Sequence, residues 1–124
     1  MAAITENRPA ASFILSEANG QRSRENGTLV SGQNLAAGTV VMDNGEGKLT
    51  AYTALDVTDG AVDEAKGILI YAGDASAGDI SVSYIARDAE VNQKLITFPA
   101  ETTVGDEEEH TIASLELIGI ICRD

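Results

Sequence analysis

The sequence predicts a mainly β, antiparallel fold with an extended N-terminal arm and one short C-terminal helix. Glycines recur at short intervals through the middle of the chain, and short runs rich in Val, Ile, Leu and Thr lie between them. Short strands separated by glycine-rich turns are typical of antiparallel sheets rather than of alternating strand–helix units. A length of 124 residues suits one domain. We therefore expect an arm at residues 1–26 and a single β-rich domain at residues 27–124.

The first 26 residues show no sustained period of 2 or 3.6, which favours an extended arm. One apolar cluster, Phe13-Ile14-Leu15, interrupts this polar stretch and needs a place to be buried. It can pack on the protein's own body, or on a partner that orders the arm on binding. The arm also carries three of the eight cationic residues, which are Arg8, Arg22 and Arg24.

Five runs in the body have the composition or the period-2 alternation of strands. They cover residues 28–30, 39–42, 48–52, 68–71 and 80–86. The Asn-Gly dipeptide in Asp43-Asn44-Gly45 tolerates positive φ and predicts a tight hairpin between the second and third of these runs. The small and polar residues at 73–78 predict the loop of another hairpin, between the fourth and fifth runs.

The C-terminal part predicts one helix followed by a last strand. Four acidic residues at 106–109 precede an apolar pattern at Ile112, Leu115 and Ile118. Acidic residues are favoured at a helix N-terminus because they complement the exposed N–H groups and the helix dipole. Gly119 suits the position after the helix, and residues 120–122 have the composition of a strand.

The charge balance limits the possible partners. Lys and Arg number 8 and Asp and Glu number 20, so the formal net charge is 8 − 20 = −12. Binding to DNA or RNA without sequence preference, or to anionic lipid, requires cations on the protein, so we expect neither nucleic acid nor a membrane as partner. No apolar run approaches the roughly 20 residues of a membrane-spanning helix. The first nine residues contain no apolar run of the kind found in secretory signals, so we expect no such signal. We expect synthesis in a cytoplasm.

No pattern of reactive residues predicts an enzyme, so we expect no catalytic residue, no metal site and no cofactor. His110 is the only histidine and Cys122 the only cysteine, which excludes a multi-histidine metal site and an internal disulfide. The acidic run at 106–109 is better explained as a solvated helix start than as an acid–base site. Two alternatives stay open: a receptor- or glycan-binding surface module, and a small β-fold hydrolase that uses carboxylates.

An ordered series of segments resembles the bacteriophage head decoration protein family, the relatives of the lambda decoration protein. The series runs from about residue 12 to the end of the chain. Its segments are FILSEANG (13–20), SRE (23–25), SGQNLAAGTVV (31–41), KLTAY (48–52), TDGA (58–61), GIL (67–69), ARDAEVN (86–92), LITFP (95–99) and LIGIICR (117–123). Two residues depart from the family pattern: Phe98 replaces a tryptophan and Glu25 replaces an aspartate.

The resemblance implies a β-clip-like fold, in which bent antiparallel ribbons form an incomplete barrel. It also implies a structural virion protein that sits as a homotrimer at three-fold positions on the exterior of an icosahedral phage head. There its N-terminal arm binds the major capsid protein and the trimer stabilises the shell against the pressure of packaged DNA. No catalysis and no cofactor accompany this family.

We expect the arm to supply the capsid-binding residues. An extended arm can add a strand to a sheet edge of the shell, where apolar side chains anchor it. Its arginines would meet acidic groups on the capsid while the acidic body faces solvent. The candidate residues are Ile4, Arg8, Phe13, Ile14, Leu15, Arg22 and Arg24.

Overall fold

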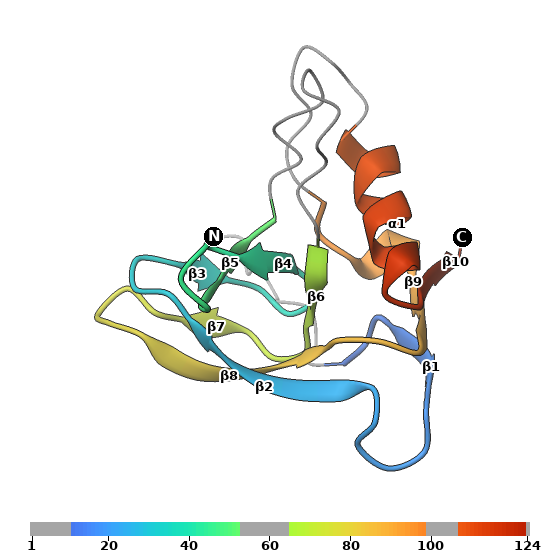
Figure 1. Cartoon of the computed structure of the whole chain (residues 1–124), viewed down its shortest axis with the longest axis horizontal. Helices are drawn as coiled ribbons and strands as arrows, with labels where there is room; N and C mark the ends of the chain where they lie inside the picture. The colour runs from blue at the N-terminus through green and yellow to red at the C-terminus, as the bar shows by residue number, and fades with distance from the viewer. Residues whose placement is uncertain (1–10, 53–64, 99–106, 124) are drawn as a thin grey trace, which may run out of the picture.

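A computed structural model of the chain describes residues 11–52, 65–98 and 107–123 (Figure 1). Within them the fold is mainly β with one α-helix close to the C-terminus, as predicted. The elements in chain order are β1 (Ile14–Glu17), β2 (Arg24–Leu29), β3 (Asn34–Leu35), β4 (Val40–Asp43), β5 (Leu49–Ala51), β6 (Ala65–Leu69), β7 (Gly73–Asp74), β8 (Ile80–Ile85), β9 (Ala89–Asn92), the 3-10 helix η2 (Gln93–Leu95), α1 (Glu107–Leu117) and β10 (Ile120–Arg123).

Five strands form a closed barrel in the order β2-β5-β4-β6-β8. The long β2 and β8 pair antiparallel from Arg24↔Ile85 to Leu29↔Ile80 and make a bent ribbon along the lower side of Figure 1. The barrel closes where β2 meets β5 in parallel, through the single pair Leu29↔Leu49. An incomplete barrel was expected from the family resemblance; here this short seam completes it.

A three-stranded sheet lies beside the barrel in the order β1-β9-β10. β9 is the central strand, antiparallel to β1 and parallel to β10. The register of β1 shifts between Ile14 and Ser16, so Leu15 is the extra residue of a β-bulge. Figure 1 shows these three strands next to α1, at the end of the molecule opposite the small β3/β7 sheet.

The helix α1 begins at Glu107, within the acidic run, and ends as the sequence indicates. Gly119 has a φ of 82° and its amide donates to the carbonyl of Glu116, which is a helix stop that favours glycine. Thr111, Ser114 and Leu115 on α1 are buried. The hydroxyl of Ser114 accepts a hydrogen bond from the amide of Ala65 at 2.7 Å and so ties α1 to the start of β6.

The predicted hairpins are confirmed in one case and modified in the other. β4 and β5 pair antiparallel around the Asn-Gly turn, in which the side chain of Asp43 accepts hydrogen bonds from the amides of Gly45 and Gly47. β6 and β8 also pair antiparallel. The segment between them is not only a loop, because Gly73 and Asp74 form β7 and pair with β3.

Two hydrophobic clusters fill the interior. The larger lies between the barrel, the three-stranded sheet and α1, and the smaller lies within the barrel around its seam. The larger contains Phe13, Val40, Tyr52, Ala65, Ile68, Ile70, Ile85, Ala89, Val91, Ile96, Leu115 and Ile120. The smaller contains Leu29, Val41, Leu49, Leu69, Ala75, Tyr84 and Ala86.

Candidate functional site

The described part of the expected arm, residues 11–26, is built into the folded body. The amide of Ala11 donates to the carbonyl of Ile70 at 3.1 Å, and β1 pairs with β9. The boundary expected between residues 26 and 27 falls inside β2. Ile4 and Arg8 lie outside the described residues, so their expected role stays a prediction.

The apolar cluster of the arm is divided between the interior and the surface. Phe13 is 1% exposed and belongs to the larger core, and its carbonyl accepts a hydrogen bond from the amide of Asn92 at 2.7 Å. Ile14 is partly buried against the same core. Leu15 is 55% exposed at the bulge. Of the two possibilities left open for this cluster, Phe13 packs on the protein's own body, and only Leu15 presents a largely free apolar surface.

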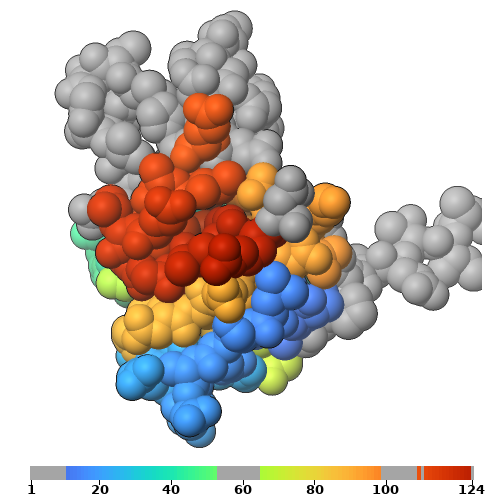
Figure 2. All heavy atoms as spheres, turned by 90° about the vertical axis from the view of Figure 1, so that its right-hand side faces the viewer, coloured from blue at the N-terminus to red at the C-terminus, as the bar shows by residue number. Residues whose placement is uncertain are grey.

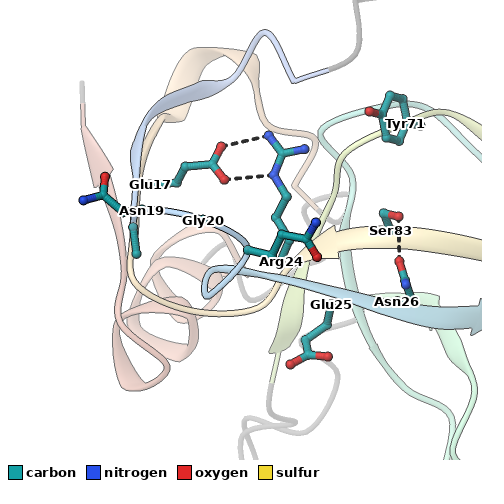
Figure 3. Close-up of a pocket in the computed structure, with 10 residues that line it drawn as sticks. Glu17, Asn19, Gly20, Arg24, Glu25, Asn26, Tyr71 and Ser83 are labelled. Carbon is teal, nitrogen blue, oxygen red and sulfur yellow. Dashed lines mark hydrogen bonds and ion pairs between the residues drawn. The ribbon is translucent and has the colours of Figure 1, made fainter.

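Both described arginines of the arm pair with carboxylates of the same chain. Arg24 donates from Nε and Nη2 to the two carboxylate oxygens of Glu17, each at 2.8 Å (Figure 3). This bidentate pair holds the pKa of Glu17 below its ordinary value and raises the pKa of Arg24. Arg22 lies 3.6 Å from the carboxylate of Asp88 and is largely exposed. Arg22 is therefore the more available of the two for a partner.

The turn that carries Arg22 is fixed by a buried serine. The hydroxyl of Ser23 accepts from the amide of Ala18 at 2.9 Å and donates to the carbonyl of Asp88 at 2.8 Å. The carbonyl of Ser23 accepts from the amide of Ala86 at 2.7 Å. Sequence reasoning missed Ser23, because its partners near residue 88 come from a distant part of the chain.

The sheet formed by β1, β9 and β10 presents a surface organised around Glu90. Its carboxylate accepts from the hydroxyl of Ser16 at 2.7 Å and from Arg123 at 2.7 and 2.9 Å. These donors lower the pKa of Glu90, with Ser16 as the larger cause. Ile121 lies opposite Glu90 on β10 and is exposed. Figure 2 shows the side of the molecule on which α1, β10, β9 and β1 lie next to one another.

A polar groove of about 730 Å³ lies between the 17–21 segment and the β2/β8 ribbon. In Figure 3, Arg24 and Tyr71 lie on opposite sides of the groove. Asn26 on β2 and Ser83 on β8 are joined by a hydrogen bond between them. The Glu17–Arg24 ion pair is part of its lining. Sequence reasoning did not identify this groove.

The described residues offer little for redox, metal or nucleophilic chemistry. Among them no group of three or more His, Cys, Asp or Glu side chains could hold a metal ion. Burial, with a smaller effect of Glu116, raises the pKa of the Cys122 thiol to about 11, so it stays protonated at neutral pH. His110 lies in α1, and its side chain is outside the described residues. No helix in the described ranges is long and apolar enough to cross a membrane.

The comparison with protein families gives a match along nearly the whole chain. Residues 3–120 match the family described as bacteriophage lambda head decoration protein D. The chain belongs to this family. A search of curated proteins gives no match.

Membership of the decoration protein family confirms the resemblance seen in the ordered segments. It makes the chain a structural protein of the phage head, associated with the capsid and located in the virion. A family of structural capsid proteins also agrees with the lack of an enzyme motif in the sequence.

Proposed function

We propose that the protein binds the exterior of an icosahedral phage head as homotrimers at three-fold positions. There it clamps neighbouring copies of the major capsid protein and stabilises the shell against the pressure of packaged DNA. The observation that carries this proposal is the family match over residues 3–120. The protein acts by binding alone, without a catalytic step or a cofactor.

The charge distribution supports an exterior location. The net charge is −12, and five cations in the described ranges are each held by a carboxylate of the same chain. A surface of this kind has few free cations with which to replace the counterions around DNA. It is therefore suited to the side of the shell that faces away from the packaged genome.

The arm is proposed to supply the first contact with the capsid. Leu15 is the exposed apolar side chain of its described part, and Arg22 is the loosely paired cation. Ile4 and Arg8 stay in the proposed contact set, whereas Phe13 and Arg24 contribute by holding the base of the arm in place. Three arms in one trimer act together, so modest affinity per arm gives strong overall binding.

Four carboxylates of the described residues lack the raised pKa that the hydrolase alternative requires. A general acid at neutral pH needs a carboxyl group with a raised pKa. The pKa values of Glu17, Asp74, Asp79 and Glu90 are all lowered, mainly by hydrogen bonds to their side chains. These four carboxylates are therefore ionised structural groups.

Binding to phage heads that lack decoration protein tests the proposal. Purified protein is mixed with such heads and imaged, and its mass in solution is measured by light scattering. We expect density at the three-fold positions on the outer surface. Heads that stay undecorated at saturating protein would refute the proposal.

A truncation tests the role of the arm. Removal of residues 1–10 spares β1 and the buried Phe13, so the body should still fold. We expect the truncated protein to bind heads more weakly than the full chain. Unchanged affinity would show that these ten residues are not part of the anchor. A start near residue 28 would be uninformative, because it removes β1, Phe13 and most of β2.

A further inference from the structure

Tyr71 differs from the other aromatic side chains of this protein in being largely exposed. The chain has three tyrosines and two phenylalanines, and all five lie within the described residues. Phe13, Tyr52 and Tyr84 are buried and Phe98 packs against the larger core, whereas Tyr71 is 54% exposed. Exposed tyrosines are over-represented among residues that dominate protein–protein binding, because a large rigid ring is covered at little cost in conformational entropy.

The backbone is fixed at the residue that precedes Tyr71. Its neighbour Ile70 is fully buried. The amide of Ile70 donates to the carbonyl of Ser83 at 3.1 Å, and the carbonyl of Ile70 accepts from the amide of Ala11 at 3.1 Å. The ring is therefore attached next to a fixed backbone segment, which limits the conformational entropy that is lost when a partner covers it.

The opposite side of the groove is also organised in advance. Nε and Nη2 of Arg24 bind Glu17, and Figure 3 shows the remaining guanidinium nitrogen turned toward the hydroxyl of Tyr71. The ion pair is partly buried and has no net charge, so covering it costs less than covering an isolated charge. Asn26 accepts a hydrogen bond from the hydroxyl of Ser83 at 2.9 Å, which orients its amide donors. An oriented amide donor of this kind can pair with a C=O group of an extended peptide.

The position of the groove indicates which peptide fits it. Ala11, where the described body begins, binds the residue next to Tyr71. The described part of the proposed arm (residues 11–26) therefore begins with a contact to the residue before Tyr71. A shell protein that engages the arm would lie close enough to reach the groove as well.

We propose that the groove lined by Arg24, Asn26, Tyr71 and Ser83 binds an extended segment of the major capsid protein, with Tyr71 as the central contact. This inference rests on the proposed function. It adds a second, preformed contact to the one made by the arm.

The test compares variants for binding to heads that lack decoration protein. Tyr71→Ala should lower the affinity about tenfold or more, as expected for loss of a central aromatic contact. Tyr71→Phe keeps the ring and should lose about threefold. Leu117→Ala is the matched control, because Leu117 is 80% exposed and does not line the groove. Thermal unfolding and solution mass are recorded for each variant and should match the wild type.

Three results would overturn the inference. If Tyr71→Ala binds heads as tightly as the wild type, the groove is not a capsid contact and the proposed function stands. If Tyr71→Ala breaks up the trimer, the groove is assigned to a second copy of this chain. Failure of the wild-type protein itself to bind would refute the proposed function and this inference together.

Discussion

Replacing Phe13 by alanine tests whether this residue acts in the hydrophobic core or as a contact with the capsid. The side chain is 1% exposed and packs in the larger cluster with residues of the barrel, the three-stranded sheet and α1. Truncation of a buried phenylalanine costs about 3–5 kcal/mol, from lost burial and from the cavity left behind. A domain is stable by about 5–15 kcal/mol in total. We therefore expect Phe13→Ala to lose a large share of the free energy of unfolding before any capsid is present.

Urea unfolding of the free protein, at one fixed subunit concentration, measures this loss. Leu15→Ala is the matched control from the same segment, because Leu15 is 55% exposed and its truncation should cost less than about 0.5 kcal/mol. The structure thus predicts different effects at Phe13 and Leu15. Phe13→Ala should impair folding, whereas Leu15→Ala should impair binding to heads. A Phe13→Ala variant as stable as the wild type would refute the placement of Phe13 in the core.

Three further predictions concern the barrel, the β1-β9-β10 sheet and the thiol. Gly67→Ala should destabilise the protein by about 1–3 kcal/mol or more, because the added Cβ would collide with the carbonyl oxygen of Ile85. Lys66 on the same strand is exposed, so Lys66→Ala should leave the free energy of unfolding in urea nearly unchanged. The folded-state pKa of Glu90 is lowered, so its stabilising effect is present above its ordinary value of 4.5 and is lost as pH falls through the folded pKa. Glu90→Gln should therefore flatten the fall of the urea midpoint below pH 4.5, and an unchanged pH profile would contradict this. Cys122, with a pKa of about 11, should react with iodoacetamide at pH 8 far more slowly in the folded than in the unfolded protein; equal rates would show a more accessible thiolate.

Short sequence signals predicted a turn and a helix end, because the backbone conformation there depends on neighbouring residues. Gly45, in the Asn-Gly dipeptide, has a positive φ in the β4–β5 turn, and Gly119 has a positive φ at the end of α1. The ordered family segments predicted the family correctly. For the turn and the helix end, the information lies within a few residues of the feature.

Pairings between distant segments were not predictable in this way. Nothing near Phe13 shows that β1 will pair with β9, and nothing near Ile120 shows that β10 will lie parallel to the same strand. The composition of the 1–26 segment favoured an extended arm, and hydrogen bonds from Ala11 and Ser23 to residues more than fifty positions away hold residues 11–26 in the body. The arginines were assigned to an external partner because charge alone does not reveal that Glu17 and Asp88 lie beside them.

The closure of the barrel has a mechanical consequence. β2 is joined to β8 along its whole length, yet it meets β5 at Leu29↔Leu49 alone, with one further bond from the amide of Val30 to the carbonyl of Leu49. A load applied across the barrel would therefore separate this seam before the β2/β8 ribbon yields. The ribbon is the stiff part of the subunit and the seam is the compliant part. Amide hydrogen exchange should therefore be faster at Val30 than along β8. In a subunit under load, β2 and β5 should separate at this seam first.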